Sequence, residues 1–231
     1  MGELNCQHRL MLEPEAYRLL QAYGIPVPAY HLATCVEQAV TAAQKIGFPV
    51  AMKIVSQDVV HKSDVGGVKL HLASAEEVRG AYGEIVALAQ EQGFAFDGVL
   101  ISEMVGGGIE TIIGLSEDQE FGKYIVFGLG GVFVELFADI SLRVLPIQKK
   151  DAEAMVTEVK SSKLLAGYRG DTPKDTAALV DILVKLAKMA QEKPLVAVDL
   201  NPVIVKENGA VVVDARFYTG DQVLCSGQRE E

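Results

Sequence analysis

Four polar side chains lie near a hairpin signal towards the C-terminal end of the chain. Asn208-Gly209 favours a tight turn, and the apolar runs on either side of it predict two antiparallel strands. Side chains alternate between the faces of a strand, so the polar residues collect on one face of this hairpin. These residues are Asp199, Asn201, Asp214 and Arg216.

The expected register brings two of these oxygen-bearing side chains together. With a two-residue turn, Glu207 pairs with Ala210, which places Asp214 diagonal to Asn201 and Arg216 directly opposite Asn201. A carboxylate and an amide on adjacent strands suit Mg2+, which takes one or two carboxylates together with phosphate oxygens of a substrate. The alternative is a solvated polar face with Arg216 in a surface ion pair.

Lys53 is the only charged residue in the apolar segment 48–55, which is predicted to be a buried strand. Burying an ammonium group is costly unless an anion meets it. A nucleotide phosphate would be a suitable anion, and so would a structural carboxylate. A third alternative is an edge-strand lysine that keeps its charged end in water.

A glycine-rich segment, 61–68, follows that strand and has nearby lysines. The backbone amides of Gly66 and Gly67 can bind phosphate, although the pattern is neither GxGxxG nor a P-loop, and a plain hairpin loop explains it equally well. His61 is the one titratable nucleophile in a distinctive setting, since neutral imidazole accepts a phosphoryl group. The alternative is that His61 is a loop histidine with no functional role.

Several carboxylates are ambiguous between a nucleotide contact and an ordinary strand-edge position. Glu103 ends one apolar strand and Glu110 lies within the next, while Glu135 and Asp139 lie between apolar stretches. No Ser/His/Asp or Cys/His arrangement is visible, so hydrolase chemistry has little support in the sequence.

Strands and helices must position these groups, and their order predicts a mixed α/β (α+β) protein. Helices are expected at 13–23, 36–46, 75–92, 151–160 and 172–191, and strands at 50–55, 69–72, 99–104, 109–115, 123–128, 196–205 and 211–217. The elements do not alternate strictly, which favours two lobes meeting near 98–105 over one doubly wound sheet. The expected division is an N-terminal segment with a helix (1–24), an N-lobe (25–100), a C-lobe (101–220) and a polar tail (221–231).

The composition and net charge of the chain disfavour some classes of binding partner. The 231 residues carry a net charge of −10, which disfavours nucleic acid and anionic membranes. Three widely spaced cysteines form no metal pattern and predict a reduced, cytoplasmic setting. No signal peptide or bilayer-spanning apolar run is visible.

Six segments, in order, resemble the nucleotide-binding subunit of ADP-forming acetyl-CoA (acyl-CoA) synthetases, a family related to succinyl-CoA synthetase. The segments are FPVAMKIVS (48–56), HKSDVGGV (61–68), ISEMVGGGIETIIG (101–114), GLGGVFVELFADISLRVLPI (128–147), LLAGYRG (164–170) and VDLNPVIV (198–205). The resemblance covers about residues 12 to 220. It implies an ATP-grasp fold, in which two lobes clamp ATP or ADP with Mg2+.

The resemblance also implies a role for each candidate residue. Lys53 would hold nucleotide phosphates, and His61 would relay phosphate between subunits. Glu103 and Val105 would contact adenine and ribose, with Glu110 on the ribose. The magnesium ligands would be Asn201 and Asp214.

The implied enzyme needs a second subunit, which binds CoA and carries its own phosphohistidine, so a hetero-oligomer is expected. The chain would be the β subunit of an acid–thiol ligase that interconverts acyl-CoA, ADP and phosphate with acid, CoA and ATP. One alternative is a stand-alone ATP-grasp carboxylate–amine ligase, which needs no relay histidine. Another is a nucleotide-sensing subunit without turnover.

Overall fold

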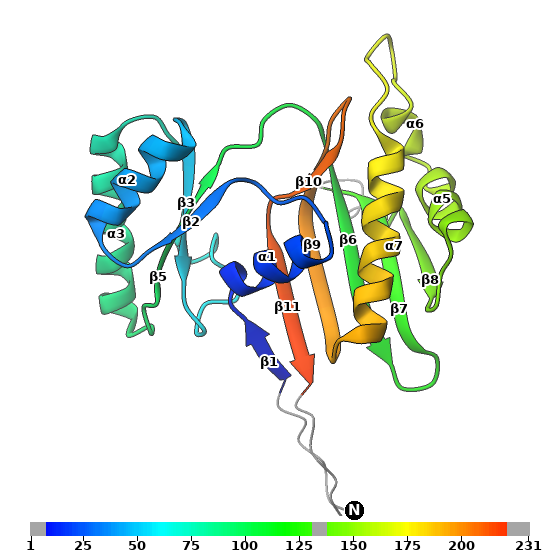
Figure 1. Ribbon diagram of the computed structural model, residues 1–231, viewed down its shortest axis with the longest axis horizontal. Helices are drawn as coiled ribbons and strands as arrows, with labels where there is room; N and C mark the ends of the chain where they lie inside the picture. Colours follow the sequence, from blue (N-terminus) through cyan, green and yellow to red (C-terminus); the bar gives the residue numbers. More distant parts are fainter. Residues whose placement is uncertain (1–7, 131–137, 221–231) are drawn as a thin grey trace, which may run out of the picture.

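Two antiparallel sheets organise the chain (Figure 1). The computed structural model describes residues 8–130 and 138–220. The strands of the small sheet are β2 (Tyr30–Ala33), β3 (Val50–Val55), β4 (Val68–Leu72) and β5 (Gly98–Glu103). Those of the large sheet are β1 (His8–Met11), β6 (Ile109–Asp118), β7 (Gly122–Leu129), β8 (Ile140–Val144), β9 (Leu195–Val205), β10 (Ala210–Val212) and β11 (Ala215–Gly220).

The small sheet has the order β2-β5-β3-β4 and is covered by two helices, α2 (Val36–Ile46) and α3 (Ala75–Gln92). The Ser74 side chain caps α3 by accepting a hydrogen bond from the amide of Glu77, as the sequence predicts for a capping position. Gly93 ends α3 in the left-handed conformation, which favours glycine. All six residues of β3 are buried, so Lys53 lies inside the lobe as expected.

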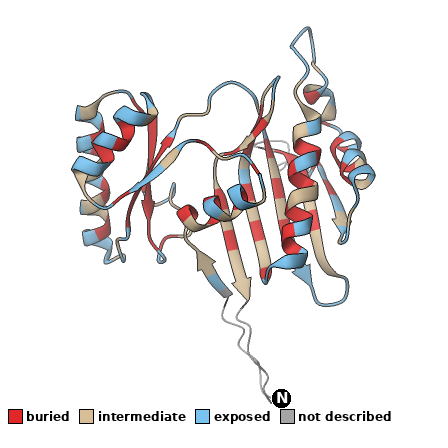
Figure 2. Cartoon of the chain, in the orientation of Figure 1, coloured by how far each residue is buried: buried red, intermediate tan, exposed pale blue. Residues whose placement is uncertain are grey.

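The large sheet has the order β1-β11-β9-β6-β7-β8, with β10 also pairing with β9. Three helices pack on one of its faces, namely α1 (Glu13–Ala22), α5 (Lys149–Glu158) and α7 (Thr176–Glu192), and a short helix α6 (Ser162–Leu165) follows α5. Alternate residues of the strands fill the core between sheet and helices, as the burial colours of Figure 2 show. Leu200 is fully buried there, whereas its neighbours Asp199 and Asn201 face the other side of β9.

Residues 104–108 carry the chain from the small sheet to the large one. Gly108 lies so close to β9 that a Cβ atom would be 2.6 Å from the carbonyl oxygen of Val205. The segment predicted to join two lobes is 98–105; β5 lies wholly in the small sheet, so the expected boundary at 100/101 falls within that strand. The described part of segment 1–24 joins the large lobe, because β1 pairs with β11.

The predicted hairpin register is wrong by two residues. β10 and β11 pair with β9 so that Val211 faces Ile204 and Phe217 faces Val198. The cause is the turn, which is centred one residue earlier than expected, with the amide of Lys206 donating to the carbonyl of Gly209 at 3.0 Å. Gly209 has a φ of +84° just after the turn, a conformation that glycine adopts readily.

A shift of two residues preserves the faces of the strands but changes the partners. Asp214 is directly opposite Asn201 instead of diagonal to it, and the amide of Asn201 donates to the carbonyl of Asp214 at 3.2 Å. Arg216 pairs with Asp199 and not with Asn201. The four polar residues therefore still share one face. In residues 8–130 and 138–220, no helix is long and apolar enough to cross a bilayer.

Candidate nucleotide and phosphoryl-transfer site

A buried group of charges lies where the small sheet meets the large one. The Lys53 ammonium on β3 is 2.7 Å from Glu13 Oε1, 3.3 Å from Asp214 Oδ1 and 2.9 Å from the carbonyl oxygen of Val213. The structural-carboxylate alternative for Lys53 is therefore realised in this arrangement. Both carboxylates belong to the large lobe, so Lys53 connects the two lobes.

Glu13, at the start of α1, also binds Lys62, whose Nζ is 2.5 Å from Glu13 Oε2 and 3.8 Å from Asp214 Oδ1. The Glu13 side chain is only 1% exposed. Sequence reasoning missed this residue, because an acidic residue in the first turn of a helix is ordinarily explained by the helix dipole. Only its long-range contacts show that it belongs to the site.

These contacts favour the charged forms of Lys53 and Asp214. Burial lowers the pKa of Lys53, but Glu13 and Asp214 outweigh that effect and the pKa is raised overall. Burial raises the pKa of the Asp214 carboxyl, but Lys53 and Lys62 outweigh that effect, and the pKa falls to about 2. Burial also raises the pKa of Asp199, against the opposing effect of Arg216.

His61 lies beside the hairpin that carries the candidate magnesium ligands Asn201 and Asp214. It is exposed, and its Nδ1 is 3.3 Å from Nη1 of Arg216. Because a guanidinium only donates, Nδ1 accepts this hydrogen bond. Nη2 of Arg216 in turn lies 3.9 Å from Oδ2 of Asp214. The segment containing His61 therefore reaches from the small lobe to the face that carries the predicted magnesium ligands.

The glycines of this segment shape the loop. The amide of Gly67 donates to the carbonyl of Lys62 at 2.8 Å, and that of Gly66 to Ser63 at 3.1 Å, so both amides are used within the loop. A Cβ atom on Gly67 would lie 2.6 Å from Cγ2 of Ile54, which explains why a glycine packs there against β3. Gly66 has a φ of +77°.

The three residues expected to contact adenine and ribose lie along the crossing between lobes. Glu103 ends β5 and accepts a weak hydrogen bond from the amide of Ala29 at 3.4 Å. Val105 lies in the crossing segment itself, and Glu110 is exposed on β6, paired with Ile204 of β9. The structure thus gathers Lys53, His61, Asn201 and Asp214 at one place and these three residues near the linker.

Asp139 has a structural position. Its carboxylate accepts hydrogen bonds from the amides of Lys160 and Ser161, at 2.8 and 2.7 Å, at the junction of α5 and α6. Burial raises its pKa, but these hydrogen bonds lower it more, and the net direction is down. Glu135 lies outside the described residues.

The donors present suit Mg2+ held jointly with a phosphate. Asp214 supplies an ionised carboxylate and Asn201 an amide oxygen directly across the strands. Within the described ranges, no group of three or more His, Cys, Asp or Glu side chains converges to hold a metal ion. Oxygens of a substrate phosphate and of water would therefore complete the coordination of any Mg2+ bound here.

Comparison with known proteins shows the family of the chain. Residues 3–218 match the ATP-grasp domain family. The chain is 45% identical over 214 residues to acetate–CoA ligase (ADP-forming) I subunit beta of Pyrococcus furiosus, covering 91% of this chain and 92% of that one. It is 46% identical to acetate–CoA ligase (ADP-forming) II of Archaeoglobus fulgidus, of which it spans 31% of the length.

A solved structure of the dinucleotide-forming acetyl-coenzyme A synthetase 1 of Ca. Korarchaeum cryptofilum, in complex with coenzyme A and Ca-AMPCP, superposes with a TM-score of 0.88. It is 48% identical and covers 91% of this chain and 93% of that one. In another structure of that enzyme, with Mg-AMPPCP, a phosphohistidine segment points towards the nucleotide-binding site (TM-score 0.80, 48% identity, 91% and 93% covered).

The fold and the site therefore define an ATP-grasp protein, and the expected two-lobed ATP-grasp fold is confirmed. Within that class, the chain belongs to the family of ADP-forming acetate–CoA ligase β subunits.

Proposed function

We propose that the chain binds ATP or ADP as the β subunit of an ADP-forming acyl-CoA (acetate–CoA) ligase. The complete enzyme would interconvert acyl-CoA, ADP and phosphate with acid, CoA and ATP. Its partner would be an α subunit that binds CoA and carries a second phosphohistidine. The relatives named as β subunits support this assignment.

The observation that carries the proposal is the contact between His61 and Arg216. Arg216 is two residues from Asp214 on the same hairpin. The contact therefore brings a nucleophilic imidazole close to a candidate magnesium ligand. A carboxylate–amine ligase has no need of a histidine there. A nucleotide sensor would have no need of one either.

In the direction of ATP synthesis, a terminal phosphate oxygen of ADP attacks the phosphorus carried by His61. The new P–O bond forms as the N–P bond breaks, and the electron pair of that bond returns to the imidazole nitrogen. Lys53 supplies positive charge beside the reacting phosphates, and Arg216 orients the ring through its contact with Nδ1. Mg2+ held by Asn201 and Asp214 would neutralise phosphate charge.

The remaining candidates would bind the nucleotide away from the transferred group. Glu103, Val105 and Glu110 lie along the crossing between lobes, where adenine and ribose would lie between the two sheets. Gly66 and Gly67 would bring the loop close to the phosphates.

The test is transient labelling of His61. The chain and its partner subunit are mixed with ATP labelled at the γ-phosphate and quenched rapidly. Acid-labile, base-stable phosphate should appear on this chain, and His61→Ala should abolish it while ATP and ADP still bind. Normal turnover of the His61→Ala enzyme would exclude the relay.

A further inference from the structure

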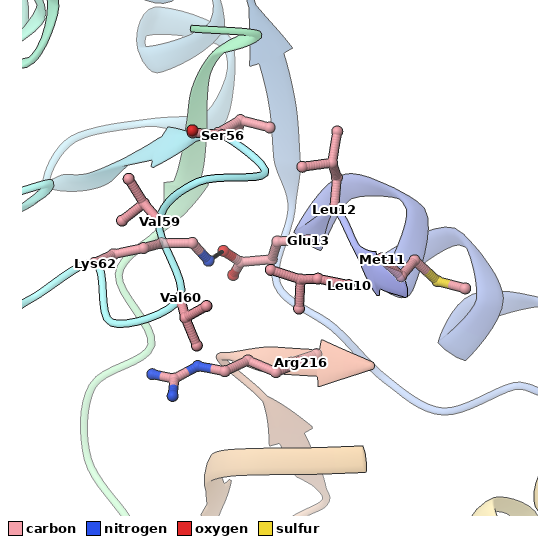
Figure 3. Close-up of a pocket in the computed structure, with 11 residues that line it drawn as sticks. Leu10, Met11, Leu12, Glu13, Ser56, Val59, Val60, Lys62 and Arg216 are labelled. Carbon is pink, nitrogen blue, oxygen red and sulfur yellow. Dashed lines mark hydrogen bonds and ion pairs between the residues drawn. The ribbon is translucent and has the colours of Figure 1, made fainter. Parts of the chain in front are cut away.

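Glu13 has no part in the functions assigned so far, yet its carboxylate joins two lysines from different elements. One oxygen meets Lys53 of β3 and the other meets Lys62, the residue directly after His61. Figure 3 shows the Lys62 side chain extending from its loop to the Glu13 carboxylate at the start of α1. Both side chains are shielded from water, at 1% exposed for Glu13 and 12% for Lys62.

The ends of the His61 segment belong to the small lobe. Val59 is buried in the small-lobe core. Gly67 packs on Ile54, and its carbonyl accepts a hydrogen bond from the amide of Ile54 at 2.8 Å. Ser63 and Asp64, between these ends, are exposed. The segment is thus anchored at both ends on one lobe.

Polar contacts hold the middle of the segment against the large lobe. Lys62 contacts Glu13 closely and Asp214 more distantly, and His61 contacts Arg216 at an exposed position. A buried, close ion pair costs more to break than an exposed or longer one, because breaking it leaves a charge unpaired in a poorly hydrated place. The Glu13–Lys62 pair is therefore the strongest of these attachments.

Building on the function proposed above, we propose that Glu13 is a positioning residue that docks the His61 segment at the nucleotide site through Lys62. The residue does not touch the reacting atoms. It holds the lysine next to His61 on the large lobe, and so raises the fraction of molecules in which His61 faces the nucleotide. Moving the segment away would require this pair to separate.

This role predicts an asymmetric effect on the two half-reactions of the complete enzyme. Labelling of His61 from γ-labelled ATP needs the docked segment, whereas labelling from acyl-CoA and labelled phosphate occurs through the partner. Glu13→Gln keeps the shape and removes the charge. It should slow the first reaction about tenfold or more while the second stays within about twofold.

Lys62→Met removes the docking contact alone, because it leaves the Glu13–Lys53 pair in place. It therefore distinguishes loss of docking from loss of the Glu13–Lys53 ion pair. It should reproduce the asymmetry, and the Glu13→Gln/Lys62→Met double variant should be no slower than Glu13→Gln alone. Glu15→Gln, on the same helix but half-exposed, is the matched control and should behave as wild type. If Glu13→Gln does not fold, the Lys62→Met variant alone decides the question.

Equal losses in both half-reactions would overturn the docking role, as would no loss or additive losses in the double variant. A failure of the proposed function looks different. In that case the wild-type enzyme itself would show no label on His61 from either direction.

Discussion

Asp214 and Asn201 lie directly opposite each other where β9 passes β11, joined by the hydrogen bond from the amide of Asn201 to the carbonyl of Asp214. The two side chains leave the sheet on the same face, so a single cation can reach both. Asp214 also contacts Lys53 and Lys62. It is therefore shared between the candidate magnesium site and the two lysines.

This relationship predicts a metal phenotype for Asp214→Asn. The variant keeps an oxygen and the shape of the side chain but loses the charge that holds Mg2+. Magnesium-dependent binding of ADP should weaken by about tenfold or more, since the only charged one of the two protein ligands becomes neutral. Titration calorimetry with and without Mg2+ measures this, and an unchanged metal dependence would remove Asp214 from the metal site.

Asp214 should also give the protein an acid-sensitive stability. Its pKa is about 2 in the folded chain and near 3.9 when unfolded, so its contribution is present above about pH 4 and is lost as the pH falls towards 2. That contribution is about 2–3 kcal/mol. Urea unfolding between pH 2 and 5 should show a steeper decline for wild type than for Asp214→Asn. Parallel pH profiles would contradict the assigned shift.

Lys53→Met should destabilise the fold as well as weaken nucleotide binding. The change leaves the buried Glu13 carboxylate with one cation fewer, and breaking a buried pair typically costs about 3–5 kcal/mol. The control is Lys69→Met, whose partner Glu84 is largely exposed and whose loss should cost less than about 1 kcal/mol. Similar unfolding midpoints for the two variants would show that the buried pair makes no net contribution.

Asp139→Ala should lower stability without changing the chemistry. The variant leaves the amides of Lys160 and Ser161 without their acceptor, at a cost of about 1–2 kcal/mol. Asp118→Ala removes a comparable pair of hydrogen bonds in an exposed turn and should cost less. Thermal unfolding, together with an assay of the holoenzyme, separates the two effects. A lost reaction at full stability would give Asp139 a functional role.

Local signals made much of the fold predictable. The buried strand around Lys53, the capped helix after Ser74 and the alternation along β9 each depend on neighbours in sequence. Alternation alone also placed Asp199 and Asn201 on the correct face. The hairpin register was wrong because it depended on which residues form the turn, and a glycine can lie within a turn or directly after it.

Long-range contacts were not predictable in the same way. The sequence showed that Lys53 needed an anion, but Glu13 lies 40 positions away on another element, and no local pattern marks the pair. Short strands were missed for a related reason. β1 and β8 have four and five residues, and each is a strand because a longer neighbour pairs with it.

The pairing of β1 with β11 has a consequence for how such a unit is combined with others. His8 is the register partner of Gly220, so the chain enters and leaves the described fold at adjacent points on one edge of the large sheet (Figure 1). Both points lie away from the crossing between lobes. A unit built in this way can be spliced into a longer polypeptide through that edge, with its ends already side by side and the face that carries Lys53 and Asp214 undisturbed.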